Sequence, residues 1–389
     1  MALLHGSWIH PALSPRGSQI LAGREGAQGD SFFFLWGETW RTVPYAEPCL
    51  TVPSHPLGLS SAELSHTLQG LLQSKAIALP SALETALNAE GQKRRKQSKT
   101  AESVQWQERG VGLLSRWKEG SATPIHSATV PDAGDEVCLF PSIVQGLRLD
   151  ATTATDLLLA LPLVADLNKE EGWLGDDLLF WSHVTRWSLD LLVRSKFLPA
   201  LVSNGDGAHA EWQPLLDSAL DQTRFRQMSE QMPSICRCYA IESNPDYLAT
   251  PLPVPANALL FASLQQLIDR QVRQGIGSPE ILDALKGLRD KDISQWLAAL
   301  ETSTGRFSLS EEGCDRLTTA LNTWTQPIQA TLSQHRSFRT VFELRPPLPP
   351  SRSWTVTYGL QATDDFSCWI SADAIWKPVA IAFQSRGAP

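Results

Sequence analysis

One stretch of the sequence, GDDLLFWSHVTRWSLDLLVRSKFLPAL at residues 175–201, carries the clearest helical pattern in the chain. Phe180, Val184, Trp187 and Leu191 recur every three or four residues along it. This spacing places side chains on one face of an α-helix. Because the face is broad and apolar, it has to pack against other elements. The stretch therefore predicts a buried amphipathic helix, and shorter runs of the same period on either side predict further helices.

Both ends of the chain have a different, strand-like pattern. The stretches are LLHGSWI (3–9), SFFFLWGETW (31–40), FRTVFELRPP (338–347) and SWTVTYGLQA (353–362), and Gly, Pro and Ser bound them. Aromatic and β-branched residues between such turn formers are typical of strands and hairpins. An isolated two-stranded hairpin is only marginally stable in water. The sequence therefore predicts an α+β fold that is mostly helical, with short β-hairpins at the N- and C-terminal ends forming one small sheet.

These patterns divide the chain into six expected segments. They are an N-terminal β segment (1–58), a helical segment (59–118) with a basic linker (91–100), an irregular connection (119–149), a helical domain (150–335), a C-terminal β-hairpin segment (336–377) and a tail (378–389). Three S-x-x-E capping boxes support the expected helix starts. They pair Ser60 with Glu63, Ser81 with Glu84 and Ser308 with Glu311. We expect Trp181, Trp187 and Trp324 to lie on the buried faces of their helices.

The charge balance limits the possible partners. The net charge of -8 argues against a surface built to neutralise nucleic-acid phosphates. The one strong basic run, GQKRRKQSKT at 91–100, is either a solvated linker or a local DNA contact. Its candidate nucleic-acid-binding residues are Lys93, Arg94, Arg95, Lys96 and Lys99. The sequence thus predicts weak DNA binding at most.

The cysteines and the apolar runs bear on the cellular location. The six cysteines are scattered, which predicts free thiols and neither a zinc site nor a disulfide framework. No secretory leader is visible, and no run approaches the ~20 apolar residues of a membrane span. We therefore expect a cytoplasmic protein with no membrane partner.

The sequence contains no familiar catalytic signature. It has no G-x-x-x-x-G-K-[ST] loop, no D-E-x-H box, no H-E-x-x-H and no G-x-S-x-G elbow. His5, Ser7 and His10 could join Glu38 or the acidic pair at 364–365 in acid–base chemistry. A polar rim beside the hairpins is the alternative for these residues. We expect no catalytic residues, no cofactor and no metal in this chain.

Four stretches together resemble the helicase-associated N-terminal region of bacterial Swi/Snf-type ATP-dependent DNA helicases and translocases. They are LHGSWI (4–9), FFFLWGETW (32–40), the helical stretch at 175–201 and the strand-like sequence at 338–376, and they cover nearly the whole chain in order. In that family these segments precede a superfamily-two motor. The resemblance therefore implies a non-catalytic accessory region that supports or regulates a motor absent from this chain, as in a truncated or split gene.

The resemblance also implies where a partner binds. The motor would act in cis or in trans, with DNA contacted only weakly or indirectly. Trp369, Ile370, Ile375 and Trp376 lie where the family chain continues, so they are the candidate partner interface. Two alternatives remain. One is a free-standing protein-interaction scaffold that does not act on DNA, and the other is a hydrolase that uses His5 or His183.

Overall fold

The computed structural model describes most of the chain. The described residues are 2–13, 31–41, 52–73, 78–89, 103–118, 121–129, 134, 136–163, 166–168, 172–204, 207–239, 254–276, 290–302, 304–333, 338–347, 354–362, 369–371 and 374. The chain forms two compact units, Met1–Thr318 and Thr319–Pro389. Each unit is described below by itself.

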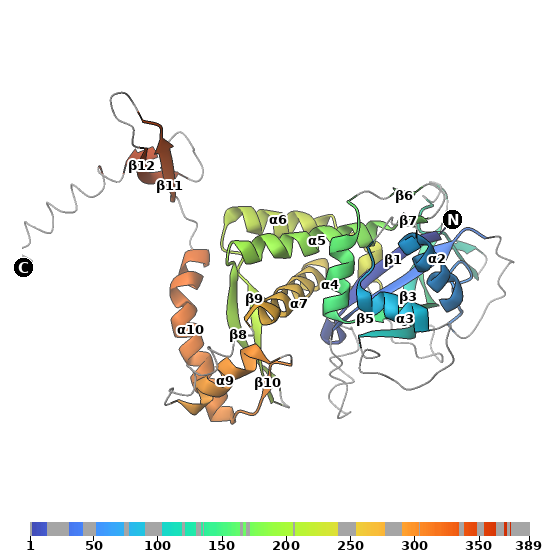
Figure 1. Cartoon of the computed structure of the whole chain (residues 1–389), viewed down its shortest axis with the longest axis horizontal. Coiled ribbons are helices and arrows are strands. Elements are labelled where there is room, and N and C mark those ends of the chain that lie inside the picture. The colour runs from blue at the N-terminus through green and yellow to red at the C-terminus, as the bar shows by residue number, and fades with distance from the viewer. Residues whose placement is uncertain are drawn as a thin grey trace, which may run out of the picture. The chain divides into compact units, whose positions relative to one another are not determined.

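A seven-stranded sheet organises the first unit, in the order β4-β3-β5-β2-β1-β7-β6 (Figure 1). In chain order the strands are β1 (Ala2–Ile9), β2 (Phe32–Thr39), β3 (Val104–Lys118), β4 (Ser121–Pro124), β5 (Val137–Leu149), β6 (Asp166–Asn168) and β7 (Gly172–Leu174). β1 and β2 are antiparallel, with His5 opposite Trp36 and Leu3 opposite Glu38. Both strands have neighbours on each side in this order, so they lie in the interior of the sheet. They are buried along nearly their whole length.

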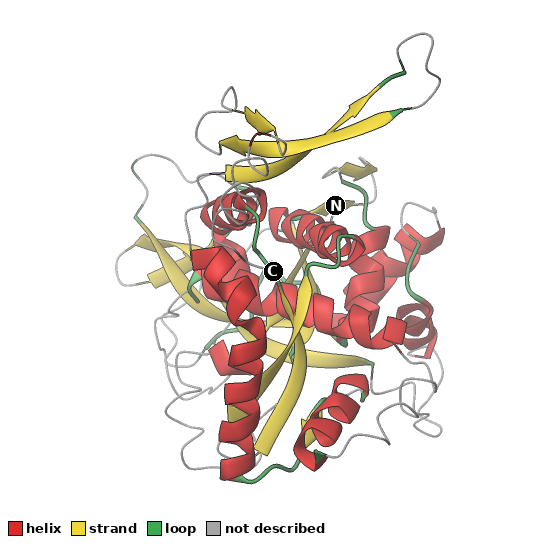
Figure 2. Ribbon diagram, turned by 90° about the vertical axis from the view of Figure 1, so that its left-hand side faces the viewer, coloured by secondary structure: helices red, strands yellow, loops and turns green. Residues whose placement is uncertain are grey.

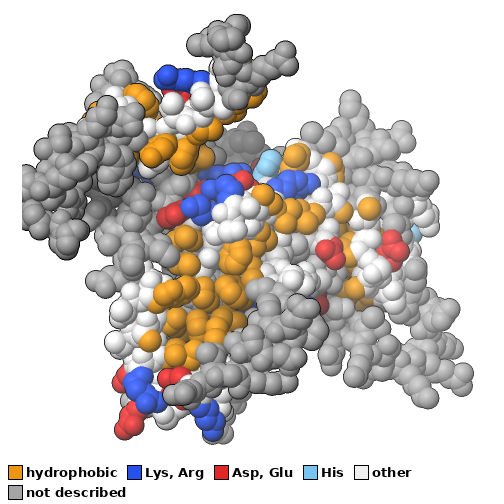
Figure 3. Space-filling model, turned by 60° about the vertical axis from the view of Figure 1, so that its left-hand side comes forward, with side chains coloured by type: hydrophobic (Ala, Val, Ile, Leu, Met, Phe, Trp, Pro, Cys, Tyr) orange, Lys and Arg blue, Asp and Glu red, His pale blue; other side chains and the backbone are white. Residues whose placement is uncertain are grey.

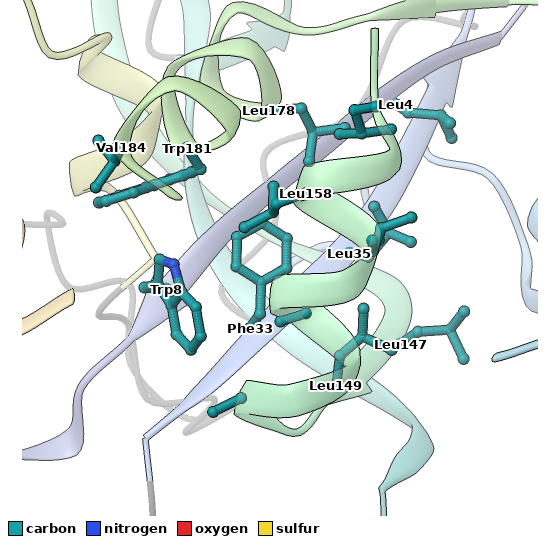
Figure 4. Packing of buried hydrophobic residues seen from close by; sticks show 14 of the residues in the cluster. Leu4, Trp8, Phe33, Leu35, Leu147, Leu149, Leu158, Leu178, Trp181 and Val184 are labelled. Atoms are coloured by element: carbon teal, nitrogen blue, oxygen red, sulfur yellow. The ribbon is translucent and has the colours of Figure 1, made fainter. Parts of the chain in front are cut away.

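Helices cover one face of this sheet. The helices of the first unit are α2 (Ser61–Gln73), α3 (Ser81–Ala89), α4 (Ala151–Ala160), α5 (Asp176–Val193), α6 (Ala219–Glu230), α7 (Ala256–Ile276) and α9 (Lys291–Glu301), with short 3-10 turns η1 (Pro11–Leu13) and η3 (Ser234–Arg237). Trp8 and Phe33 from the sheet pack with Leu158 of α4 and Trp181 of α5 in the main apolar core (Figure 4). The helix expected within 175–201 is confirmed as α5. Its Trp181 and Trp187 are fully buried.

A second, smaller core lies on the opposite face of the sheet. It contains Phe32, Phe34 and Trp36 of β2 together with Val144 of β5, and Tyr239 packs against them. Successive side chains of a strand point to opposite faces. Phe33 and Leu35 accordingly belong to the main core, while their neighbours in β2 belong to this one. The run FFFLW is therefore apolar throughout because both faces of the strand are covered.

A three-stranded sheet of order β10-β9-β8 completes the first unit. Its strands are β8 (Phe197–Asn204), β9 (Gly207–Pro214) and β10 (Arg306–Phe307). Arg273 of α7 joins this sheet to α9, because its guanidinium donates hydrogen bonds to the carbonyl oxygens of Ala210 and Ala299. β8 begins only four residues after α5 ends, so the last part of the stretch 175–201 is strand and not helix.

The second unit contains a three-stranded antiparallel sheet of order β11-β12-β13. Its strands are β11 (Phe338–Arg345), β12 (Thr355–Ala362) and β13 (Trp369–Ser371). The helix α10 (Glu311–Ser333) begins in the first unit and ends in the second. Trp324 of α10 is 57% exposed, so the expectation that it is buried is wrong. Its helical spacing is correct, but the described residues do not cover that face.

The predicted fold class is wrong. Helices and strands alternate throughout the chain, which is mixed α/β (Figure 2). The N-terminal strands pair with each other and with β5 and β7, and the C-terminal strands pair only among themselves within the described residues. The expected single small sheet therefore does not exist.

The physical reason for this error lies in β3 and β5. We expected the first within a helical segment and the second within an irregular connection. Gly110 and Gly112 interrupt β3, and Pro141 and Gly146 interrupt β5, so neither has a clean alternating pattern. What stabilises these strands is a 13-pair ladder between them, from Val104 with Leu149 to Arg116 with Val137. Such long-range pairing is invisible to a local pattern.

The capping boxes had mixed outcomes. The Ser60–Glu63 box is confirmed, since the Glu63 amide donates to Ser60 Oγ at 3.3 Å and the Ser60 amide donates to Glu63 Oε2 at 2.8 Å. Ser81 is the first residue of α3 and not its cap. At α10 the cap is Ser310, whose Oγ accepts from the Gly313 amide at 3.1 Å, so the expected cap at Ser308 is two residues early.

Candidate functional site

A cluster of buried ionisable side chains lies in the first unit, on the Trp36 side of the large sheet. Its members, called the polar cluster below, are His5, Glu38, His55, His126 and Asp177. Each is at most 5% exposed. Groups of this kind are rarely buried unless they are paired and hydrogen-bonded. The cluster is therefore the feature of this fold that most needs a physical account.

His5 lies between two carboxylates. Its Nδ1 is 3.0 Å from Asp177 Oδ1, and its Nε2 is 3.3 Å from Glu38 Oε1. Both ring nitrogens face acceptors, so the imidazole is a doubly protonated cation. Burial alone would lower the pKa of His5, but the attraction and hydrogen bonds of Asp177 and Glu38 outweigh it and raise the pKa to about 10. His5 is thus charged at neutral pH.

Glu38 accepts hydrogen bonds from β1 and from the loops around residues 55 and 127. It accepts hydrogen bonds from His55 Nε2 at 3.2 Å and from the Ser127 amide at 2.7 Å. Burial would raise the pKa of Glu38, but hydrogen bonds from His5 and His55 and the nearby His5 charge hold it well below its usual range. The carboxylate is therefore ionised and is held by donors from β1 and from two loops.

His126 has a different role from His5. Its Nδ1 lies 3.5 Å from Glu38 Oε1 but also accepts a hydrogen bond from the Ala128 amide at 3.2 Å. A nitrogen that accepts a hydrogen bond carries no proton, so this imidazole is neutral, with its proton on Nε2. Burial correspondingly lowers the pKa of His126. The indole of Trp40, which is 56% exposed, stacks on this ring at 3.9 Å and shields it.

Asp177 is placed by the start of α5. Its Oδ2 accepts from the Gly6 amide at 2.9 Å and from the Tyr239 hydroxyl at 3.1 Å. Tyr239 in turn accepts from Trp36 Nε1 at 2.7 Å. Burial and the Asp177 charge raise the pKa of Tyr239 well above its usual value, so it stays a hydroxyl donor. Both oxygens of the Asp177 carboxylate therefore face hydrogen-bond donors, from His5, Gly6 and Tyr239.

The N-terminus of α5 has no room for a side chain. A Cβ on Gly175 would lie 2.4 Å from Asp177 Oδ1 and 2.6 Å from His5 Nδ1. Gly175 is the N-cap of α5, and the helix starts with Asp177 in its first turn, where the helix dipole favours negative charge. The glycine thus permits the close approach of the His5–Asp177 pair.

The arrangement suits structural cohesion better than catalysis. A cation held between two carboxylates connects β1, β2 and α5 and, through Glu38, the segments around residues 55 and 126. All of its members are buried, and His5 itself is 2% exposed. Within the described residues, no group of three or more His, Cys, Asp or Glu side chains is arranged to hold a metal ion. His55 Nδ1 and His126 Nε2 have no hydrogen-bond partner there.

Sequence reasoning named part of this cluster. It proposed His5 with Glu38, and the structure brings these two together. Ser7 instead donates to the Cys236 carbonyl, and His10 contacts the hydroxyls of Ser31 and Ser263 at 2.8 and 2.9 Å. The alternative of a polar rim is wrong, because these side chains are buried between strands and helices. The acidic pair at 364–365 lies outside the described residues.

Four participants were missed. They are His55, His126, Asp177 and Tyr239. In the sequence, Asp177 is one of two acidic residues at the start of a predicted helix, where the helix dipole alone accounts for it, and the two histidines stand in loops without a motif. Asp177 is 172 residues from His5, and no local signal reports such a contact. His183, named for a hydrolase, is exposed on α5 and is not part of the cluster.

Most of the other predicted site residues lie outside the described residues, and two lie on β13. Lys93, Arg94, Arg95, Lys96 and Lys99 lie outside the described residues. Trp369 and Ile370, on β13, are 38% and 37% exposed. Ile375 and Trp376 lie outside the described residues. The described cysteines carry free thiols, and burial raises the pKa of Cys236 and Cys238.

The fold and the site define a mixed α/β protein built on a seven-stranded sheet with a sealed ionic cluster. No protein-family model, curated protein or solved structure matches the chain. Among the helices in the described part of the chain, none combines the length and the apolar character that a membrane crossing requires.

Proposed function

We propose that this chain is a non-catalytic accessory module of a Swi/Snf-type ATP-dependent DNA translocase, and that it supports or regulates the motor by docking on it. The observation that carries the proposal is an apolar sheet face in the second unit. The resemblance described above supplies the identity of the partner.

The docking face is one side of the β11-β12-β13 sheet. Phe342 lies opposite Tyr358, and Leu344 lies opposite Val356, so the four side chains share one face. They are 71%, 50%, 61% and 60% exposed, in that order. Ile370, next to β12, continues the face at 37%. Figure 3 shows hydrophobic side chains gathered on the surface of this small sheet.

Such a face favours a partner. Contiguous apolar patches above a few hundred Å² are rare on monomeric proteins and mark interaction sites. Burying one side chain of this size is worth about 1.5–3 kcal/mol, so four or five together could hold a partner. The opposite side of the sheet carries Glu343 and Arg345, which pair at 2.8 Å, and Thr357. Trp369, opposite Gln361, lies on this second side and is 38% exposed. The docking face therefore carries most of the exposed apolar side chains of the sheet, and the other side is mainly polar.

The motor is the occupant that fits the position of this face in the chain. In the family that the sequence resembles, the segment at 338–376 leads directly into the motor, so the face lies beside the point of attachment. The chain also contains no phosphate-binding loop and no D-E-x-H box. The ATP chemistry of the pair would thus come from the motor alone.

The experiment mixes this chain with a separately expressed Swi/Snf motor fragment and measures binding by calorimetry and ATP turnover on DNA. We expect a complex, and no turnover by the chain alone. Val356→Glu places a charge on the docking face and should weaken binding at least tenfold. The matched control is Thr355→Glu, which introduces the same charge one residue earlier, on the other face, and should bind normally.

Three outcomes would contradict the proposal. The first is the absence of a complex with motor fragments. The second is equal binding by the two variants, and the third is DNA-stimulated ATP hydrolysis by the purified chain. A stable complex with a protein unrelated to DNA would favour the alternative of a free-standing interaction scaffold.

A further inference from the structure

The end strands of a β-sheet carry backbone N–H and C=O groups that can pair with a further strand. In the described part of the chain most end strands are short, because β4, β6, β10 and β13 have two to four residues each. β8 is longer, but Pro199 removes one of its backbone donors, and Trp296 Nε1 donates to its Ala200 carbonyl at 3.2 Å. These edges are therefore poorly suited to accept another strand.

β11 is the exception among these end strands. It has eight residues, none of them proline, and among the described strands it pairs with β12 alone. Five of its side chains are exposed, those of Thr340, Phe342, Glu343, Leu344 and Arg345. Natural proteins usually shorten, cover or interrupt an edge of this length. β11 is thus the end strand in the described part of the chain that is best suited to pair with another strand.

The charges on β11 do not protect its edge. Unpaired charged side chains on an edge strand discourage the approach of another strand. Glu343 and Arg345 instead pair with each other at 2.8 Å, on the side of the sheet opposite the docking face. Val341 lies on the same side as this pair and is half-buried. The segment 340–345 therefore carries no net charge that would repel a strand.

The sequence of β11 is complementary to a second copy of itself. Two antiparallel copies related by a two-fold axis at Val341 place Val341 opposite its own counterpart and Thr340 opposite Phe342. Residue 339 is an arginine in the sequence, and this register places it opposite Glu343 of the other copy. Directly opposed residues of an antiparallel pair lie on the same side of the sheet, where opposite charges attract. Opposite charges therefore meet in this register, and like charges do not.

We infer that β11 pairs with β11 of a second copy of this chain, so that the two three-stranded sheets join into one larger sheet. A two-fold axis perpendicular to the sheet keeps Phe342 and Leu344 of both copies on the same side, so the two docking faces become continuous. The opposite edge, β13, has only three residues, and the pairing therefore closes at two copies. This inference concerns the edge of the sheet and does not depend on the partner proposed for its face.

The experiment measures the mass of the full chain by sedimentation equilibrium and light scattering between about 1 and 200 μM. We expect an equilibrium of monomer and dimer with no larger species. Val341→Glu brings two new carboxylates together at the axis and should weaken the dimer about tenfold or more. Thr355→Glu is the matched control, because Thr355 is exposed on the same side of the sheet but belongs to β12. This control should dimerise like the native chain.

A cysteine cross-link locates the two-fold axis. Opposed Cα atoms of an antiparallel pair lie about 4.5–5.5 Å apart, which is a separation that a disulfide spans. Val341→Cys should therefore give a covalent dimer on mild oxidation, seen on a denaturing gel without reductant. Thr355→Cys is the matched control and should give no more covalent dimer than the native chain. The cross-link tests the inference even if Val341→Glu fails to fold, which circular dichroism would show.

A further variant separates this inference from the proposed function. Val356→Glu changes the docking face on β12 and leaves the edge unchanged, so it should dimerise like the native chain. Val341→Glu should conversely still bind the motor fragment. If no motor fragment binds but Val341→Cys forms the covalent dimer, then the proposed function fails and this inference stands.

Any of three results overturns the inference. The chain is a monomer at the highest concentration, the folded variants Val341→Glu and Thr355→Glu dimerise equally well, or a dimeric chain with Val341→Cys forms no more covalent dimer than its control.

Discussion

Asp177 Oδ1 lies 3.0 Å from His5 Nδ1, and this contact joins the first strand of the chain to the first turn of α5, 172 residues away. Both side chains are almost completely buried, at 0% and 2% exposure. The pair therefore connects the centre of the large sheet to the helix that covers it.

Asp177→Asn should strongly destabilise the first unit. It leaves the His5 cation buried with one of its two carboxylates removed, and breaking a buried ion pair on one side costs about 3–5 kcal/mol. Asp176→Asn is the matched control, because Asp176 is the exposed neighbour in the same helical turn. It should cost less than about 1 kcal/mol, the size of an exposed helix-dipole contribution. Urea unfolding measures both, and similar losses for the two variants would refute the role of the pair.

Stability should fall as the pH rises above neutral. The folded-state pKa of His5 is raised to about 10, while an unfolded histidine titrates near 6.5. The stabilisation is complete below pH ~6.5 and is lost as the pH approaches the folded value. Between pH 6.5 and 8.5, the free energy of unfolding should drop by about 1.4 kcal/mol per pH unit from this residue.

Two measurements test this decrease of the free energy of unfolding with pH above 6.5, called the alkaline slope below. Urea titrations at several pH values give the slope itself, and NMR should show one imidazole that stays protonated up to pH 8.5. Asp176→Asn should keep the slope of the native chain. A histidine resonance assigned to His5 that titrates near pH 6.5 would exclude a charged His5.

His10 should make the stability fall on the acid side as well, as the pH drops below about 6.5. Burial lowers its pKa to about 4, so the folded state resists protonation between pH 6.5 and 4 while the unfolded state accepts a proton. Stability from His10 is complete above pH ~6.5 and is lost as the pH falls towards 4. With His5, this predicts maximum stability near pH 6.5. His10→Gln retains a donor and an acceptor for Ser31 and Ser263. In urea titrations it should reduce the loss of unfolding free energy between pH 6.5 and 4 and leave the loss above pH 6.5 unchanged.

DNA binding should be weak and strongly dependent on salt. Among the residues of the basic run, Lys93, Arg94, Arg95, Lys96 and Lys99 are five possible phosphate contacts. The slope of log affinity against log salt should then be no steeper than about -4.5 on duplex DNA. Replacing the first three with Ala should make the slope shallower in proportion, and replacing all five should abolish binding. Fluorescence anisotropy between 25 and 200 mM salt measures this, and tight binding by the fivefold variant would place the contact elsewhere.

The sequence predicted single elements better than their arrangement. The helix within 175–201 and the burial of Trp181 follow from a local period, and the structure confirms both. β3 and β5 were missed because their stability comes from pairing with each other across residues 119–136, which no local pattern records. Likewise His5 and Glu38 could be named from their chemistry and proximity in the chain, whereas Asp177 could not. Its role depends on how α5 packs on β1.

The last prediction tests the close approach at the start of α5. Gly175→Ala introduces a Cβ that would lie 2.4 Å from Asp177 Oδ1 and 2.6 Å from His5 Nδ1, so the ion pair has to separate. Overpacking of this kind costs about 1–3 kcal/mol, and weakening the buried pair adds to it. Gly70→Ala is the matched control, because a Cβ on Gly70 in α2 meets no atom within 4 Å.

The two glycine variants should change stability in opposite directions. Alanine is favoured over glycine inside a helix by about 0.5–1 kcal/mol, so Gly70→Ala should stabilise the chain. For Gly175→Ala we also expect the His5 pKa to fall towards its ordinary value, because the carboxylate that raises it is displaced. The alkaline slope of stability should therefore become shallower in this variant and remain unchanged in Gly70→Ala. If Gly175→Ala is as stable as the native chain and keeps the full alkaline slope, then the glycine is not what allows His5 and Asp177 to meet, and the pair must be held by the strand and helix packing alone.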